Sequence, residues 1–108
     1  MSQPLRIALL GFTRTERAAL EAFFRLADKR TPAYEQVREL GRAHLVLLDT
    51  DDELEFARAT ELGIAKRCVA VGGRELPGAI LQAPRPLNVL RLVSRLDRLC
   101  EPAPAAAG

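Results

Sequence analysis

Short apolar runs alternate with amphipathic stretches along most of the chain. Four runs have strand length, and they cover residues 5–10 (LRIALL), 45–48 (LVLL), 68–71 (CVAV) and 79–81 (AIL). A weaker fifth strand is expected at residues 34–37, after Pro32. The run at 45–48 does not alternate with polar residues, so we expect both of its faces to be buried, as in the middle of a parallel sheet.

Two amphipathic stretches between these runs predict helices. Residues 14–27 repeat apolar side chains at three- and four-residue spacing, and Thr13 with Glu16 forms a capping box at their start. Residues 52–62 carry a second helical pattern. An aspartate before this second helix supplies its N-cap, either Asp51 or Asp52.

A third helix is expected at residues 87–99. Its apolar stripe consists of Leu87, Leu90, Val93 and Leu96, widened by Leu92 and Leu99. A basic stripe beside it consists of Arg91, Arg95 and Arg98, with Arg85 before the helix. Such a basic stripe is typical of a solvated face, and it also suits contact with an acidic partner or a phosphate ligand such as a cyclic dinucleotide. The apolar stripe is broader than contact with the core requires, so the helix suits a homodimer or partner interface.

The alternation of strands and helices predicts one α/β domain at residues 5–100, with a parallel sheet covered on both faces. Right-handed crossovers make this a doubly wound fold. Residues 72–78 are too few for a full helix with two turns, so the fourth helix is expected to be absent or reduced to one turn. The second helix looks shortened, because residues 38–42 hold at most one short turn.

The totals limit the classes of function. The 108 residues suit one domain, and a net charge of +2 from 16 basic and 14 acidic side chains argues against DNA binding through a strong basic field. The two cysteines, Cys68 and Cys100, are not at zinc spacing and fit a reducing compartment. Residues 1–4 form a short N-terminal tail without a signal-peptide pattern, and no apolar run approaches the roughly 18 residues of a membrane span. We therefore expect a cytoplasmic protein.

The C-terminal residues 101–108 (EPAPAAAG) are rich in proline and alanine. This composition is typical of a disordered end or of a linker to a further domain.

In a doubly wound fold the site lies at the carboxyl ends of the strands. Four segments fall there, at residues 11–15, 49–52, 72–74 and 83–86.

The stretches AHLVLLDTDDE at 43–53 and AILQAPRPLNVLRLVSRL at 79–96 resemble parts of the receiver domain of bacterial response regulators. The first stretch is similar to the family's strand that ends in the phosphoacceptor aspartate, which places Asp49 at that position. The second stretch is similar to the last strand, the Lys-Pro turn and the last helix, with Pro84 at the turn proline. The resemblance covers residues 5–99 and implies a flavodoxin-like five-stranded parallel sheet of order 2-1-3-4-5.

The chain departs from the receiver pattern at the positions that carry the chemistry. Gly11, Phe12 and Thr13 stand where the family has an acidic pair that holds Mg²⁺. Gly72 replaces the Thr or Ser of the fourth strand, and Ala83 replaces the lysine. Phosphoryl transfer to a carboxylate requires a cation, and neither the acid pair nor the lysine is present, so we expect no phosphorylation of the usual kind, no catalysis and no cofactor. The chain is expected to be a pseudo-receiver that works by contact with protein partners or with itself.

Other interpretations stay open. Asp49 is either a remnant phosphoacceptor or a turn residue between strand and helix. The segment DTDDEL, with aspartates at i and i+2, also resembles the first motif of haloacid-dehalogenase-like phosphatases, although a second acid pair does not follow. A third hypothesis is that the domain is a sensor, in which Gly72, Gly73, Arg74 and Arg85 bind a phosphorylated metabolite or cyclic nucleotide.

Overall fold

The computed structural model describes residues 4–26 and 33–100, apart from the side chain of Cys100. The expected tail at 101–108 and most of the N-terminal tail lie outside these residues. The described chain forms one parallel five-stranded sheet of order β2-β1-β3-β4-β5, which confirms the predicted fold class. The strands are β1 (Leu5–Leu10), β2 (Tyr34–Gln36), β3 (Leu45–Asp49), β4 (Cys68–Val71) and β5 (Leu81–Ala83).

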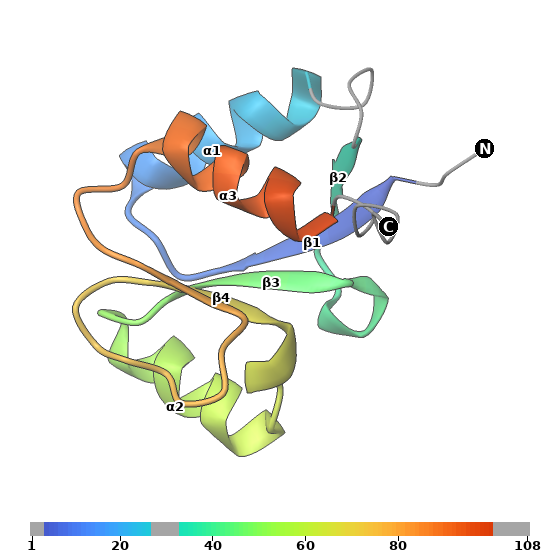
Figure 1. Ribbon diagram of the computed structural model, residues 1–108. Coiled ribbons are helices and arrows are strands. Elements are labelled where there is room, and N and C mark those ends of the chain that lie inside the picture. The colour runs from blue at the N-terminus through green and yellow to red at the C-terminus, as the bar shows by residue number, and fades with distance from the viewer. Residues whose placement is uncertain (1–3, 27–32, 101–108) are drawn as a thin grey trace, which may run out of the picture.

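The helices lie on both faces of the sheet (Figure 1). They are α1 (Arg14–Leu26), α2 (Glu53–Leu62) and α3 (Val89–Cys100). Helices α1 and α3 cover one face, where Leu20, Phe24 and Leu96 pack on inward side chains of β1, β3 and β4. Helix α2 covers the other face through Ala59 and Phe56. A separate apolar core therefore lies on each side of the sheet.

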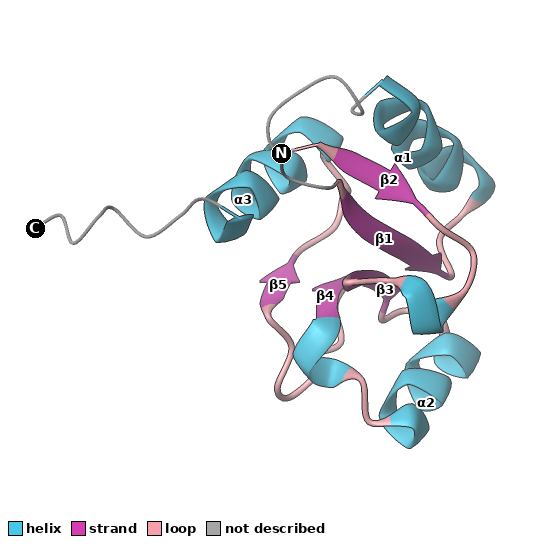
Figure 2. Ribbon diagram, turned by 90° about the vertical axis from the view of Figure 1, so that its right-hand side faces the viewer, coloured by secondary structure: helices cyan, strands magenta, loops and turns pink. Residues whose placement is uncertain are grey.

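The central strand β3 is buried along its whole length, as its unbroken apolar run predicts. Its neighbours are β1 and β4, and Leu47 lies opposite Leu9 on one side and Val69 on the other. In the arrangement of Figure 2, β2 and β5 form the two edges of the sheet.

The two helices that were expected to be lost or shortened are short turns in the described chain. Between β2 and β3 the chain forms only a 3₁₀ turn at Leu40–Arg42, and between β4 and β5 it forms bends and turns without a helix. Leu76 and Ala79 of the β4–β5 loop fill the space beside α2 instead. This loop therefore covers the sheet where a helix would otherwise lie.

The predicted position of the last strand is wrong by two residues. The apolar run AIL suggested 79–81, whereas the strand is Leu81–Ala83. As an edge strand, β5 leaves Gln82 exposed, and the Gln82 amide bonds the loop before it, donating to the Arg74 carbonyl at 3.2 Å and accepting from the Leu76 amide at 3.3 Å. Polar contacts of this kind help to set the bounds of β5, and the pattern of apolar residues does not predict them.

The predicted apolar stripe of the last helix is also partly wrong. Leu92, Val93 and Leu96 are buried, but Leu90 is 73% exposed. The helix begins at Val89 rather than at residue 87, because the Asn88 side chain accepts a hydrogen bond from the Arg91 amide at 3.0 Å and caps it. Within the described residues, no helix is long and apolar enough to cross a bilayer.

Candidate functional site

Arg85 joins three carboxylates at the carboxyl edge of the sheet. Its Nη1 donates to Asp49 Oδ1 at 2.8 Å and to Asp51 Oδ2 at 2.6 Å. Arg85 lies in the loop from β5 to α3, and Asp49 ends β3, so the contact crosses the end of β4, which lies between these two strands in the sheet. The arginine side chain is 24% exposed, which makes this a half-buried ion-pair network rather than a surface pair.

The third carboxylate is that of Glu16, in the first turn of α1. Arg85 Nε donates to Glu16 Oε2 at 3.0 Å, and Nη2 donates to Oε1 at 2.8 Å. This is a bidentate pairing, the strongest geometry for an arginine with a carboxylate. One guanidinium therefore links the start of α1, the end of β3 and the segment before α3.

Asp49 has each carboxylate oxygen occupied. Oδ1 accepts from the Asp51 amide at 3.0 Å as well as from Arg85, and Oδ2 accepts from the Phe12 amide at 2.9 Å. The residue is only 6% exposed. Asp49 therefore fixes the backbone of two loops, the role of a turn residue at the strand–helix junction.

The turn after β1 adopts an unusual backbone in order to reach Asp49. Gly11 and Phe12 both have positive φ, of 86° and 80°, and a Cβ at Gly11 would lie 2.8 Å from the Cβ of Asp49. A positive φ at a non-glycine residue costs on the order of 1–3 kcal/mol and persists only where the surroundings impose it. The close approach and the positive φ explain why glycine stands at position 11.

Gly72 is required at the end of β4 for a similar reason. Its φ is 140°, and a Cβ there would lie 2.5 Å from Thr50 Oγ1 and 2.8 Å from Asp51 Oδ2. The following amide, that of Gly73, donates to Asp51 Oδ1 at 3.2 Å. Asp51 thus occupies the space into which a Thr or Ser side chain at position 72 would project.

The pairing shifts the acid–base properties of both partners. The hydrogen bond from Arg85 lowers the pKa of Glu16 below its ordinary value, against the opposing effect of burial, and bonds from Thr13 add to the lowering. The pKa of Arg85 is raised, first by Glu16 and then by Asp49 and Asp51. Both directions favour the charged pair at neutral pH.

The expectation that this site lacks a cation is wrong. It rested on Ala83 standing at the lysine position, but β5 ends at Ala83, and the side chain of Arg85 reaches back over the strand ends to Asp49. The Nε, Nη1 and Nη2 atoms of Arg85 each donate to a carboxylate within the domain. Sequence reasoning also missed Glu16, which it saw only as part of the capping box, and the available signal was an acid at the carboxyl edge near Asp49.

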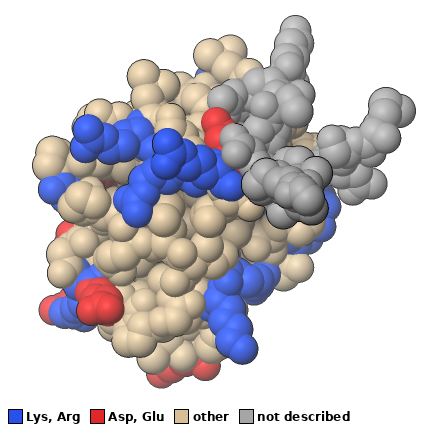
Figure 3. All heavy atoms as spheres, in the orientation of Figure 1, with Lys and Arg blue, Asp and Glu red and all other residues tan. Residues whose placement is uncertain are grey.

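The remaining candidate residues lie apart from this network. Arg74 stacks on the Phe56 ring at 4.9 Å and lies 4.0 Å from Glu53. Arg91 and Arg98 are exposed on α3, whereas Arg95 is half-buried and donates to the Gln82 carbonyl at 3.3 Å. In Figure 3 basic side chains cross the face of the molecule over α3.

The DTDDEL segment divides its acids between two structural tasks. Asp52 is the N-cap of α2, with Oδ1 accepting from the Glu55 amide at 3.1 Å, whereas Asp51 belongs to the arginine network. Asp49 and Asp51, the i and i+2 pair, both bond to the same Arg85 nitrogen. Across residues 4–26 and 33–99, no group of three or more His, Cys, Asp or Glu side chains has a geometry that could hold a metal ion.

The glycine pair after β4 has its amides committed internally. The Gly72 amide donates to the Ala83 carbonyl at 3.0 Å, as part of the contact with β5, and the Gly73 amide donates to Asp51. A phosphate cradle needs such amides to point at the ligand. In this conformation they point at protein oxygens.

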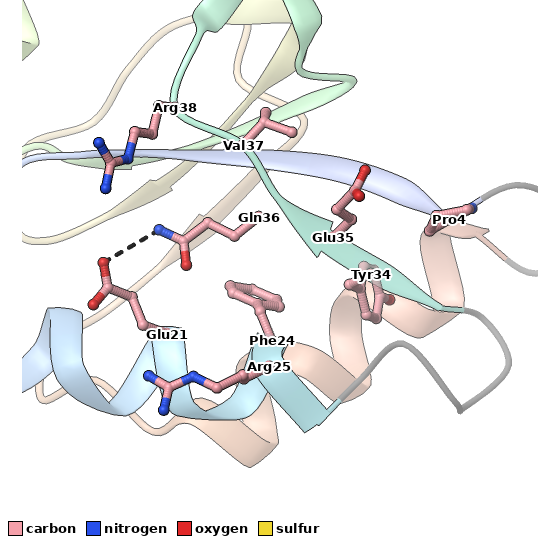
Figure 4. Close-up of a pocket in the computed structure, with 9 residues that line it drawn as sticks. All are labelled: Pro4, Glu21, Phe24, Arg25, Tyr34, Glu35, Gln36, Val37 and Arg38. Atoms are coloured by element: carbon pink, nitrogen blue, oxygen red, sulfur yellow. Dashed lines mark hydrogen bonds between the residues drawn. The ribbon is translucent and has the colours of Figure 1, made fainter.

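A pocket of about 510 Å³ lies between α1 and the edge strand β2 (Figure 4). Phe24 and Tyr34 form its apolar part, and Gln36 donates to Glu21 at 3.3 Å across it. None of the candidate residues from the sequence lines this pocket.

Comparison of the chain with protein-family models, with curated proteins and with solved structures finds no match in any of the three.

Proposed function

We propose that this domain is a non-catalytic signalling module, a receiver-like domain of the bacterial cytoplasm that acts through protein–protein contact and is not switched by phosphorylation. The observation that carries the proposal is the bonding of Asp49 to Arg85. A phosphoacceptor needs an accessible oxygen and a cation that can neutralise the incoming phosphoryl group. Here the cation belongs to the protein and is shared with Glu16 and Asp51.

The resemblance to receivers supports the proposal at the level of layout. A parallel sheet of order 2-1-3-4-5 with an aspartate at the end of β3 is what the resemblance implies. Arg85 lies two residues after Ala83, the position that the resemblance assigns to the lysine, and its side chain brings a cation to Asp49. Under this proposal, Arg85 permanently provides the positive charge that the metal ion and the lysine provide in an active receiver.

The contact surface in this proposal is the solvent side of α3. Arg91 and Arg98 are exposed there beside Leu90, so the surface combines positive charge with apolar area. Such a surface suits either a partner with an acidic contact face or another copy of the chain.

Phosphorylation can be tested directly with the intact chain. The protein is incubated with acetyl phosphate and Mg²⁺ and its intact mass is measured, with Asp49→Asn as the matched control. We expect no stoichiometric gain in mass for either protein. A gain of one phosphoryl group that the Asp49→Asn substitution abolishes would sink the proposal.

A sensor for phosphorylated ligands is the competing function. It would require the Gly73 amide and the Arg85 guanidinium, both of which bond to carboxylates in the structure, and three acids would face the incoming anion. A thermal-shift screen with nucleotides, cyclic dinucleotides and inorganic phosphate separates the two functions. We expect no stabilisation, whereas a concentration-dependent rise in Tm with one nucleotide would favour the sensor.

A further inference from the structure

Two helix faces on opposite sides of the molecule carry exposed leucines. On α2, Leu54 is 83% exposed, and on α3, Leu90 is 73% exposed. Because α2 and α3 cover different faces of the sheet, their solvent sides point away from each other (Figure 1). No contact within one copy of the described chain can bring these two surfaces together.

The charges on the two helices are opposite in sign. Helix α3 carries three arginines and one aspartate, a net charge of +2. Helix α2 carries three glutamates and one arginine, a net charge of −2. In Figure 3 basic side chains lie over α3 in the upper part of the molecule, and acidic side chains appear at its lower edge, near α2, where basic side chains are also present.

The charges nearest the exposed leucines are largely uncompensated on α3. Within the part of the chain that the structure describes, Arg91 and Arg98 form no ion pair, and helical spacing places both on one side of the face that Leu90 and Ser94 present. On α2 the helical spacing places Glu61 two turns from Leu54, on the same side. Arg58 on this helix pairs with Glu55 at 3.8 Å, and Glu53 lies 4.0 Å from Arg74, so Glu61 carries the unpaired negative charge of α2 among the described residues.

We propose that the domain associates head to tail with copies of itself, the solvent face of α3 on one copy packing against the solvent face of α2 on the next. Leu90 would meet Leu54 at the centre, and Arg91 and Arg98 would face Glu61. This inference rests on the proposed function, since it names the partner of a domain that acts by contact. A two-fold contact of α3 with α3 would bring arginine against arginine, and like charges across an interface are unfavourable.

The geometry sets the form and strength of the assembly. A contact between different surfaces leaves one free surface at each end, so it builds an open chain or a closed ring rather than a two-fold dimer. The two helices have 10 and 12 residues, so their contact is small. Interfaces below about 1,200 Å² of total buried area are weak and transient. The association is therefore reversible, dependent on concentration and weakened by salt.

Sedimentation velocity of the full chain at increasing concentration tests the assembly. We expect the weight-average sedimentation coefficient to rise toward about 1 mM protein, the range of weak contacts, and the rise to shrink when salt increases from about 0.05 to 0.5 M. Leu54→Arg places a positive charge opposite basic α3, and Leu90→Glu places a negative charge opposite acidic α2. Each variant alone should remain monomeric, whereas a 1:1 mixture should associate, because each copy then offers a face that complements its neighbour.

The matched control is Leu26→Glu, because Leu26 is 80% exposed on α1 and belongs to neither surface. This variant should associate like the wild type, and far-UV circular dichroism should show all three variants folded. A wild-type chain that stays monomeric to 1 mM at low salt overturns the inference. So does a Leu54→Arg variant that associates like the wild type, which would indicate a two-fold contact through α3. A phosphoryl gain on Asp49 would sink the proposed function while leaving this result standing.

Discussion

Glu16 belongs to two structures at once. Its Oε1 accepts from the Thr13 amide at 3.1 Å, which completes the capping box of α1, and the same oxygen accepts from Arg85 Nη2. The capping box needs only a side chain that can accept a hydrogen bond, whereas the pairing with Arg85 benefits from full negative charge. The two roles can therefore be separated by one substitution.

Glu16→Gln should keep the capping box and lose the charged pairing. We expect it to lower the free energy of unfolding by about 1.5–3 kcal/mol at pH 7, the range for hydrogen bonds to a charged group. Because the pKa of Glu16 is lowered in the folded chain, its contribution is present in full above its ordinary value of 4.5 and is lost as the pH falls further. The difference between wild type and variant in urea titrations should therefore shrink between about pH 4.5 and pH 3. A difference that stays constant over this range would contradict the assignment.

Arg85→Ala removes the cation from three carboxylates, of which Asp49 is buried. We expect a loss of about 2–3 kcal/mol at pH 7, below the range for a fully buried pair because Arg85 is partly exposed. Urea unfolding measures the loss. Arg98→Ala, on the exposed side of α3, is the matched control and should change stability by no more than about 0.5 kcal/mol. Equal stability of the two variants would mean that the network contributes nothing.

At the level of single residues the sequence indicated Asp49 but not its partners. A carboxylate at the end of an apolar strand must lie at the carboxyl edge of the sheet once the fold class is known. The reach of Arg85 depends instead on the turn that follows β5, and the Phe12 amide reaches Asp49 only because Gly11 and Phe12 adopt positive φ. Helix and strand patterns contain no information on such turns.

At the level of elements the apolar pattern located all three helices and the first four strands, because burial imposes a period that short apolar runs reveal. The pattern failed where polar contacts determine the structure. Gln82 ties β5 to its own preceding loop, and Asn88 determines where α3 begins. Within this helix Leu92, Val93 and Leu96 face the sheet, whereas Leu90 lies beside that stripe and is 73% exposed.

Two leucines of α3 test this orientation with the same chemical change. Leu96 is fully buried, so Leu96→Ala should cost about 2–5 kcal/mol in the free energy of unfolding. Leu90→Ala, on the exposed side, should stay within about 0.5 kcal/mol of the wild type. Measurements at micromolar concentration keep self-association out of the comparison. The reverse order of the two costs would show that the helix is rotated from the position described.

At the scale of the whole molecule the question is whether the two cores unfold together. One core lies between the sheet and α1 with α3, and the other lies beside α2. The strand β3 contributes Leu47 to the first core and Leu48 to the second, so a loss of order in this strand opens both. Asp49 at its end connects β3 to Arg85 and to the turn after β1. These shared elements favour one cooperative transition.

Each core contains a native probe. Tyr34, the one tyrosine of a chain without tryptophan, is buried in the first core, where it packs edge-on against Phe24 and donates to Asp97 Oδ1 at 2.6 Å. Cys68 is buried in the second core, where burial raises the pKa of its thiol and keeps it unreactive. In a Cys100→Ser variant, Tyr34 fluorescence and Cys68 labelling by a thiol reagent therefore report the two sides of the sheet separately. We expect both to change at the same urea midpoint, as a two-state transition requires. Labelling of Cys68 at lower urea than the fluorescence change would show that the α2 side of the sheet opens first. The two cores would then not unfold as one cooperative unit.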